Sequence, residues 1–402
     1  MRFWVGGYSD DADGSAPGIG VLHAGAPDAV LAGDLALAGV AARALSPSWI
    51  AAHPSLDVIY AAEEVAGTVQ AFVRTGEESF APLGAAVDAG ELVCHVAVAP
   101  DGGSLIASCW GDGRVVRYPL APDGRIGAAR VAPAAADPYA APDLDPVGDA
   151  SPLPGLDAFA AMGDLPLFGQ APVLGAPAID PDAARDVAPA PDVPPENERT
   201  SRAHQARHLP GGIVATTDMG FDLVRFWSRS GGAFIEDQRV ALPRGSGPRH
   251  MVWHPSGHLY LVTELSLEAF VLAPDPSARA SERWRIVGGT PLAREVTVGA
   301  DAAAEIALTR DGQHAVIGIR GSNTLASLRV HGGGAELRPV ALAESGVDWP
   351  RHHVIARDTI LVAGQRSNEV AALALDERTG APGRVRGRIE VPSPTRLLPD
   401  RR

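Results

Sequence analysis

Short apolar strands joined by Pro/Asp/Gly turns recur along this chain at a nearly constant spacing. Each copy alternates apolar and small or polar residues, turns, and continues as an apolar run, which is the pattern of a β-hairpin. Four clear copies and two weaker ones are Ile50–Tyr60, Val96–Ile106, Met251–Tyr260 and Ile306–Val316, then His208–Val214 and Ile355–Leu361. Apart from one longer gap, the copies lie roughly 45 to 55 residues apart, which predicts the blades of a β-propeller.

The two ends of the chain are expected to build a seventh blade. Phe3–Tyr8 and Gly18–Leu22 have the pattern of strands, and Val391–Leu398 that of a last short strand. Pairing this last strand with the first ones closes the ring and removes an exposed sheet edge. The sequence therefore predicts an all-β, seven-bladed propeller spanning residues 1–402 as a single domain, with six or eight blades as the alternatives.

The long gap between the second and third copies is an insertion of different composition. Residues 133–195 are rich in Ala, Pro and Asp, a composition that cannot bury a core and favours extended or disordered chain. Only Leu156–Met162 has helical spacing of apolar residues. We expect a loop on one face of the propeller, with a lid over the central channel or a partner-binding segment as the alternatives.

Composition excludes several classes of function. The net charge of −14 argues against nucleic acid as a partner, because phosphate binding needs a basic face. All 34 basic residues are arginine, so Schiff-base and lysine-base mechanisms are excluded. The N-terminus lacks the apolar core of a signal peptide, and no apolar run is long enough to cross a membrane. We expect a cytoplasmic protein without a membrane partner, with reduced cysteines, and monomeric because a closed propeller needs no partner.

Polar residues at repeated positions beside the inner strands are the candidates for function. His95, His204, Arg249–His250 and Arg351–His352 each precede or open a copy of the repeat. Glu63 and Glu264 follow apolar strands at what we take to be the same offset, as does Arg320. An arginine aimed into a channel needs an anion, either a carboxylate of the protein or a ligand.

A structural interpretation competes with the functional one for the histidines. His53 and His254 belong to the hairpin turns and are expected to be structural. His95, His250 and His352 could equally hold the backbone of a neighbouring blade. His352 and His353 are adjacent, so on a strand they point to opposite faces and cannot chelate one ion. Together with the absence of zinc, phosphate-loop and nucleophile-elbow motifs, this predicts neither a metal nor another cofactor.

Taken together, these motifs resemble the bacterial lactonase family of seven-bladed propellers, which includes 6-phosphogluconolactonases and, more distantly, fungal carboxymuconate lactonising enzymes. The matching segments are Val5–Ser9, Cys94–His95, Ala203–His204, Gly247–His250, Thr263–Glu264, Glu305–Ile306, Ile319–Gly321, Pro350–His352 and Val391–Pro394. The resemblance implies hydrolysis of a small anionic, sugar-derived lactone. A lactonising cycloisomerase acting on a dicarboxylate and a non-catalytic binding propeller are the alternatives.

The resemblance also implies which residues form the site. His204, Arg249, Glu264 and Arg320 match the family's proposed active-site group. Around them, the residues that we expect to contact the substrate are His95, Arg202, His250, Arg351 and His352. Arg202 marks a departure, because the family usually has Pro-His-Ala-His where this chain has Ser201–His204.

Overall fold

The computed structural model describes residues 1–25, 34–140, 199–230 and 233–401. Most of the predicted insertion, including Leu156–Met162, lies outside the described residues. All strands of the described residues belong to one compact unit, Met1–Tyr139 with Pro194–Arg402.

Within the described residues the strands form seven antiparallel sheets, which we number as blades in chain order. Blades 1 and 2 are β29 (Pro394–Pro399), β1 (Arg2–Gly7), β2 (Ile19–Ala24), β3 (Leu35–Ala42), and β4 (Pro47–Ala52), β5 (Val58–Glu63), β6 (Thr68–Arg74), β7 (Phe80–Pro82), β8 (Val87–Asp88). Blades 3 and 4 are β9 (Val93–Val98), β10 (Ser104–Cys109), β11 (Val115–Pro119), β12 (Arg130–Val131), and β13 (Ala203–His208), β14 (Val214–Asp218), β15 (Leu223–Ser230), β16 (Ala233–Ala241). Blades 5 and 6 are β17 (Pro248–Trp253), β18 (Leu259–Thr263), β19 (Glu268–Pro274), β20 (Trp284–Pro291), and β21 (Ala302–Leu308), β22 (His314–Arg320), β23 (Thr324–His331), β24 (Glu336–Glu344). Blade 7 is β25 (Pro350–Ala356), β26 (Thr359–Gly364), β27 (Glu369–Leu375), β28 (Pro382–Glu390). The short 3-10 helices are η1 (Asp10–Ala12), η2 (Pro210–Gly212), η3 (Ala280–Glu282) and η4 (Gly332–Gly334).

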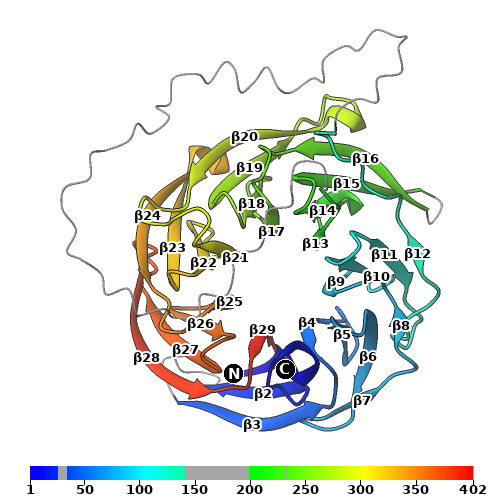
Figure 1. Ribbon diagram of the computed structural model, residues 1–402, viewed down its shortest axis with the longest axis vertical. Coiled ribbons are helices and arrows are strands. Elements are labelled where there is room, and N and C mark those ends of the chain that lie inside the picture. The colour runs from blue at the N-terminus through cyan, green and yellow to red at the C-terminus, as the bar shows by residue number, and fades with distance from the viewer. Residues whose placement is uncertain (26–33, 141–198, 231–232, 402) are drawn as a thin grey trace, which may run out of the picture. The chain divides into compact units, whose positions relative to one another are not determined.

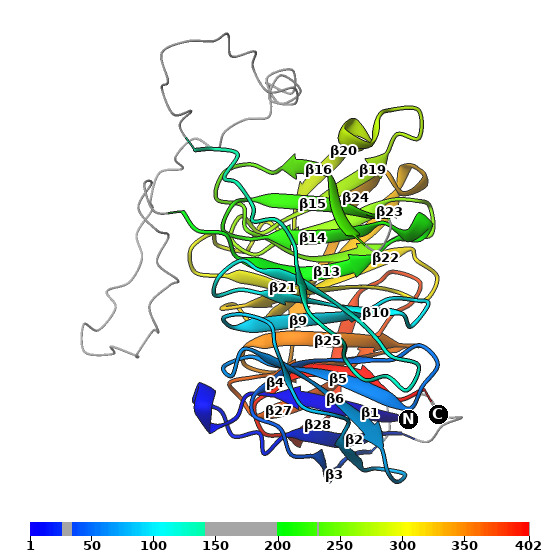
Figure 2. The same ribbon diagram turned by 90° about the vertical axis from the view of Figure 1, so that its right-hand side faces the viewer.

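The seven sheets stand around a common axis, each with one strand facing the centre (Figure 1). The inner strands β29, β4, β9, β13, β17, β21 and β25 contact one another in that order, and β25 contacts β29 again. The C-terminal strand β29 pairs with β1, for example Trp4 with Leu398. Both termini therefore lie beside each other in the two views (Figure 2), and the prediction of a seven-bladed, end-closed propeller is confirmed.

The turn histidines His53 and His254, which the sequence predicts to be structural, connect neighbouring blades. The ring of His53 lies 3.2 Å from the carbonyl oxygen of Gly102 in the next blade. His254 makes the same contact with Gly312, at 2.9 Å. Both glycines have positive φ; a side chain at Gly102 would collide with the ring of His53, and one at Gly312 would crowd the ring of His254. Histidine and glycine in successive turns thus fit one another and fix the spacing of the blades.

Every inner strand is irregular near its start. In blade 5, Pro248 pairs with Thr263 and His250 with Val262, so that Arg249 has no opposite partner. This is a β-bulge, which bends the strand and redirects its side chains. The bulges of the seven blades fall at Thr395, Ser48, Cys94, His204–Gln205, Arg249, Ala304–Glu305 and Arg351.

Candidate active site

The bulges build a small cavity on the propeller axis. Its lining consists of bulge residues or their successors from six of the seven inner strands: Ser48, Trp49, Cys94, His204, Arg249, His250, Arg351 and Thr395. A side chain at a bulge escapes the strict alternation of a strand, so two successive residues can face the same cavity. Arg249 and His250 do so here. The backbone irregularity is therefore what concentrates polar groups at this point.

Two of the predicted site arginines share one carboxylate. Glu264 follows β18, and its Oε2 lies 2.7 Å from Nε of Arg249 and 2.7 Å from Nη2 of Arg320. Burial works against the ionised form of Glu264, but the charges of Arg320 and Arg249 outweigh burial and hold the pKa of this carboxyl below its usual value. The structure thus brings together three of the four residues that the resemblance implies.

The two arginines differ in how completely they are satisfied. Arg320 also donates from Nη2 to the carbonyl oxygen of Ala303, at 3.0 Å. Arg249 is 3% exposed, and its Nη1 has no hydrogen-bond partner among the described residues. Burial, together with the charge of Arg320, lowers the pKa of Arg249 to about 10, so it remains a cation at neutral pH. Arg249 therefore presents an unpaired, buried donor to the cavity.

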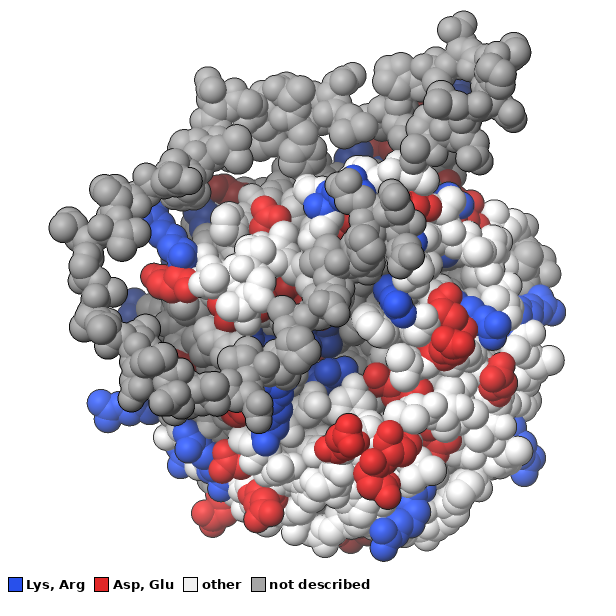
Figure 3. All heavy atoms as spheres, in the orientation of Figure 1, with Lys and Arg blue, Asp and Glu red and all other residues white. Residues whose placement is uncertain are grey.

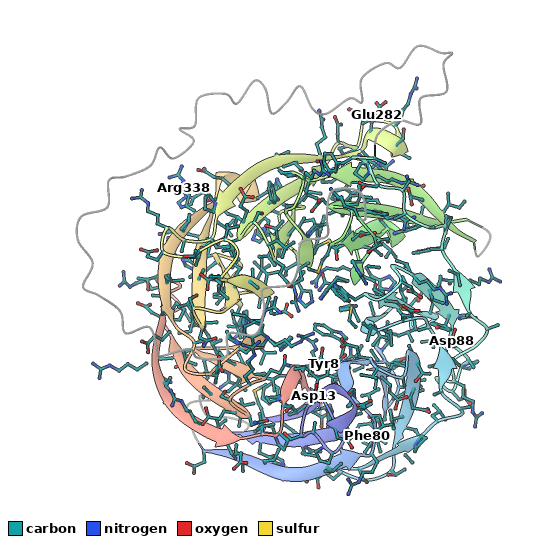
Figure 4. The ribbon with its side chains drawn as sticks, in the orientation of Figure 1. Tyr8, Asp13, Phe80, Asp88, Glu282 and Arg338 are labelled. Carbon is teal, nitrogen blue, oxygen red and sulfur yellow. The ribbon has the colours of Figure 1, made fainter. Side chains whose placement is uncertain are left out.

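A third arginine is held by residues that the sequence analysis did not select. Nη2 of Arg351 donates to the hydroxyl of Tyr8 at 2.7 Å, and that hydroxyl lies 3.0 Å from each carboxylate oxygen of Glu64. Figure 4 shows Tyr8 at the edge of the central channel. Burial raises the pKa of Tyr8, so it stays a neutral phenol that can accept from Arg351 and donate to Glu64.

The offset assigned to Glu63 was wrong by one residue. Glu63 pairs with Pro47 in the sheet and accepts a hydrogen bond from Thr68. Glu64, instead, occupies the position of Glu264, because the backbone N–H of each donates to the carbonyl of the residue before the inner strand of its own blade. The cause is the hairpin turn of blade 2, which is one residue longer: the N–H of His53 donates to the carbonyl of Val58, five residues on, and that of His254 to the carbonyl of His258, four residues on.

His204 lies in the cavity as a neutral imidazole. Burial, and then the charge of Arg249, holds its pKa well below 6.5. Its Nδ1 has no hydrogen-bond partner among the described residues. Its ring centre lies 5.0 Å from that of His250, which also lines the cavity. His204 is thus available to accept a proton.

His95 and His352 each bind the backbone of a neighbouring blade. Nδ1 of His95 accepts from the backbone N–H of Ala206 at 3.4 Å, and Nδ1 of His352 accepts from Leu397 at 3.3 Å. In blade 4, Gln205 makes the corresponding bond to the next blade. Burial, and then the charge of Arg396, holds the pKa of both histidines well below 6.5. Their assignment as substrate contacts stays a prediction.

The carboxylate of Glu305 lies beside His250 and His352. Its Oε2 lies 3.0 Å from Nδ1 of His250 and 3.2 Å from Nε2 of His352. Arg396 contacts His352 and stacks over Trp49 at 4.0 Å. In the sequence, Glu305 stands out only as part of a motif, and Trp49 and Arg396 do not stand out, because neither residue type signals a function at one isolated position.

Arg202 contacts Trp110 and Gly111 in blade 3. Its Nη1 donates to the carbonyl oxygens of Trp110 and Gly111, at 3.2 and 2.7 Å, and its guanidinium stacks over the Trp110 ring at 4.3 Å. These contacts connect the start of blade 4 with the end of β10. The role of Arg202 in substrate binding stays a prediction.

The buried residues around the central channel carry an excess of positive charge. They interact electrostatically with one another, and the histidines among them are neutral. The charged side chains are five arginines, Arg207, Arg249, Arg320, Arg351 and Arg396, and three carboxylates, Glu64, Glu264 and Glu305. By contrast, Figure 3 shows acidic and basic side chains interspersed over the described surface. A buried site with unbalanced cations favours an anionic ligand.

The described residues offer little support for a metal site, a disulfide or a membrane span. There, no three or more His, Cys, Asp or Glu side chains are grouped as metal ligands. Cys94 and Cys109 are buried free thiols. No helix among the described residues is long and apolar enough to span a membrane.

Comparisons with known proteins agree with this fold. The sequence model of the family "Lactonase, 7-bladed beta-propeller" matches residues 2–140 and 180–399. A 6-phosphogluconolactonase of Bacillus subtilis is 25% identical over 205 residues, which cover 50% of this chain and 58% of that protein. A probable 6-phosphogluconolactonase of Arthroderma benhamiae is 28% identical over 203 residues, covering 46% of this chain and 50% of that protein. The chain thus spans little more than half the length of these relatives.

Solved structures share the architecture of the described residues. The periplasmic gluconolactonase of Pseudomonas aeruginosa superposes with a TM-score of 0.75 at 19% identity, covering 99% of this chain and 98% of that one. A protein from Lactobacillus plantarum gives the same TM-score at 18% identity, with the same coverage. At this level of identity the likeness concerns the fold alone.

Proposed function

This chain belongs to the lactonase family of seven-bladed β-propellers, and on that premise we propose that it hydrolyses a small anionic lactone derived from a sugar. One observation carries the proposal. Nη1 of Arg249 and Nδ1 of His204 are both buried, both without a hydrogen-bond partner among the described residues, and both belong to residues lining one cavity. Leaving such groups unpaired is costly unless a ligand satisfies them.

His204 suits the role of general base better than Glu264 does. Glu264 is ionised, but its Oε2 is engaged by Arg249 and Arg320, which occupy the atom that would have to take the proton. His204 is neutral, and no described residue occupies its Nδ1. Glu264 then acts as a positioning residue that orients Arg249 toward the cavity.

The reaction follows from these roles. Water adds to the lactone carbonyl carbon while His204 takes one of its protons. Arg249 donates to the oxyanion of the tetrahedral intermediate, where a preformed cation stabilises the developing charge. The intermediate collapses, the ring C–O bond breaks, and His204 returns the proton to the leaving oxygen. The product is the open hydroxy acid, whose carboxyl group then releases its proton to solvent and becomes a carboxylate.

For this reaction the lactone must also be able to reach the cavity. Its volume is about 10 Å³, room for about one water molecule. A lactone therefore binds with its carbonyl at the cavity and the rest of its ring toward the channel mouth, with lining side chains displaced. Arginine side chains can make such a movement because they turn about several single bonds.

The test is turnover of freshly made 6-phosphogluconolactone and gluconolactone by the purified protein, with spontaneous hydrolysis subtracted. We expect enzymatic opening of at least one of them, reduced in Arg249→Ala and His204→Asn. No rate above background on either lactone overturns the proposal and leaves the cycloisomerase and the binding propeller as the alternatives to pursue.

A further inference from the structure

One side chain from each inner strand belongs to a layer that crosses the channel. Each of these residues stands two positions after the last residue that pairs before the bulge. They are Trp49, His95, Gln205, His250, Glu305, His352 and Arg396. The ring centre of Trp49 lies 4.5 to 5.5 Å from those of the three histidines, although these come from blades 3, 5 and 7. Three histidines at equivalent positions can therefore be compared directly.

The hydrogen bonds of these three histidines place their protons differently. In His95 and His352, Nδ1 accepts a backbone N–H of the next blade, at 3.4 and 3.3 Å, so the single proton of the neutral imidazole lies on Nε2. In His250, Nδ1 lies 3.0 Å from Oε2 of Glu305 instead. A carboxylate only accepts, so the proton of His250 lies on Nδ1 and its lone pair on Nε2. Burial, and then the charge of Arg249, holds the pKa of His250 well below 6.5 and keeps it neutral.

The lone pair of His250 completes a set of unpaired groups around the cavity. His250 is 1% exposed, and its Nε2 has no hydrogen-bond partner among the described residues. His204 and Arg249, which line the same cavity, have Nδ1 and Nη1 in the same condition. The cavity thus offers two acceptors and one donor in a volume of about 10 Å³. A buried water molecule makes about three hydrogen bonds, which matches this set.

We propose that His250 orients the attacking water, which donates one hydrogen to Nε2 of His250 and the other to Nδ1 of His204. The inference rests on the proposed lactone hydrolysis and adds to it a catalytic residue, His250, and a positioning residue, Glu305. As the water oxygen bonds to the lactone carbonyl carbon, the proton facing His204 passes to Nδ1. The O–H bond facing His250 stays intact and becomes the hydroxyl of the tetrahedral intermediate.

Glu305 matters because it decides what Nε2 of His250 does to the water. With the proton on Nδ1, Nε2 accepts a hydrogen of the water and leaves the oxygen lone pairs free for attack. With the proton on Nε2, the same atom would donate to the water oxygen and occupy a lone pair that the attack requires. A water held by two fixed acceptors also cannot turn away from the carbonyl carbon.

The first experiment reads the tautomers directly and needs no substrate. Protein labelled with ¹⁵N in histidine gives long-range ¹H–¹⁵N correlations that distinguish Nδ1–H from Nε2–H, with signals assigned by through-bond correlation to the backbone. At pH 7 we expect Nδ1–H for His250 and Nε2–H for His95 and His352, which serve as internal references. The wild type suffices for this measurement, so it does not depend on the folding of a variant.

The second experiment removes the carboxylate and keeps His250. In Glu305→Leu we expect the Nδ1–H pattern of His250 to be lost and kcat to fall about 10- to 100-fold, with little change of KM, as for a misplaced reacting group. The matched control is Glu236→Leu. It also takes a carboxylate from a buried arginine, Arg225, but on the outer strand β16. This control should keep both the kcat and the His250 tautomer of the wild type.

The two readouts separate this inference from the proposed hydrolysis. A wild-type His250 protonated on Nε2 overturns the inference whatever the rates. A lost Nδ1–H pattern with unchanged kcat in Glu305→Leu also overturns it and leaves lactone hydrolysis standing. A lower kcat with the Nδ1–H pattern intact overturns the positioning role of Glu305. No turnover of 6-phosphogluconolactone or gluconolactone by the wild type overturns the hydrolysis and the catalytic role of His250, while the spectrum still decides its tautomer.

Discussion

Arg351 donates a hydrogen bond to the hydroxyl of Tyr8 at 2.7 Å, although the two residues are 343 positions apart in the sequence. Tyr8 follows β1 in blade 1, and Arg351 lies on β25 in blade 7. Their contact depends on the pairing of β29 with β1, which brings the two ends of the chain together. Closure of the propeller and completion of the site are therefore the same structural event.

The first prediction concerns this contact. Tyr8→Phe removes the acceptor of Arg351 and the donor to Glu64, so Arg351 loses its orientation. We expect KM for the lactone to rise by about 10-fold, corresponding to about 1.4 kcal/mol, with a smaller effect on kcat. Tyr60→Phe is the matched control, because its hydroxyl donates to the carbonyl of Gly124, away from the cavity. An equal change of KM in both variants would contradict the role of Tyr8.

The second prediction distinguishes the role of Arg249 from that of Arg320. Arg249 has a free buried donor, whereas Arg320 also holds the carbonyl of Ala303. Arg249→Ala should therefore reduce kcat by about 100- to 1000-fold, the usual effect of losing an oxyanion donor. Arg320→Ala should cost more stability, measured as Tm, because it leaves the carbonyl of Ala303 without this donor. Melting curves and steady-state rates of both variants test the distinction; a larger loss of kcat in Arg320→Ala would reverse the assignment.

The third prediction is a pH dependence of stability caused by Glu264. Its pKa is lower in the folded protein than its ordinary value of 4.5, so its ionised form stabilises the fold above that value. This contribution is lost as the pH falls below 4.5 toward the lower folded pKa. The difference in Tm between wild type and Glu264→Gln should thus shrink from pH 6 to pH 4. The exposed Glu377 provides the control, Glu377→Gln, for which we expect no such trend.

The fold could be predicted from the sequence because its signals are local. Each hairpin carries its own turn residues, such as His254 and Gly312, and apolar strands flank them. Arg249, Glu264 and Arg320, which the resemblance selects by motif, also lie together in the structure. Tyr8 could not be predicted in this way, because its partner is supplied by the other end of the chain.

The choice of Glu63 has a local physical cause. The turn between β4 and β5 is one residue longer than that between β17 and β18, because His53 donates its N–H to Val58 and His254 donates its N–H to His258. Counting from the turn histidine therefore selects Glu63 where Glu64 lies in the site.

The fourth prediction concerns the histidines below the cavity. Burial holds the pKa of His95 well below 6.5, so the unfolded chain takes up a proton below pH 6.5 that the folded chain does not. Acidification from pH 7 to 5 should therefore destabilise the protein, by up to about 1.4 kcal/mol per pH unit for each such histidine. In His95→Gln this slope should be smaller, with stability at pH 7 nearly kept, because Gln205 makes the same bond to the next blade. Urea unfolding at pH 7, 6 and 5 gives both quantities. An unchanged slope would mean that His95 titrates normally.

The last prediction concerns the Ala-, Pro- and Asp-rich insertion and the proposal that the chain forms a single domain. The residues on either side of positions 141–198 contact each other: Nε of Arg199 lies 3.3 Å from Oδ2 of Asp137, and its guanidinium lies 5.3 Å from the ring centre of Tyr139. Two chain ends already in contact can be joined by a short loop with little closure cost. Replacing 141–198 by a linker of about six Gly and Ser residues should therefore keep the Tm.

Activity of the same deletion variant decides among the interpretations of the segment. The groups proposed for catalysis, His204, Arg249 and Glu264, all lie on blades 4 and 5 outside it. We therefore expect kcat/KM on both lactones within about twofold of the wild type, as for changes away from a site. A loss of activity with unchanged Tm would instead support a lid. Unchanged activity together with loss of a copurifying protein would make the segment a binding site for that partner, added to a propeller that works without it.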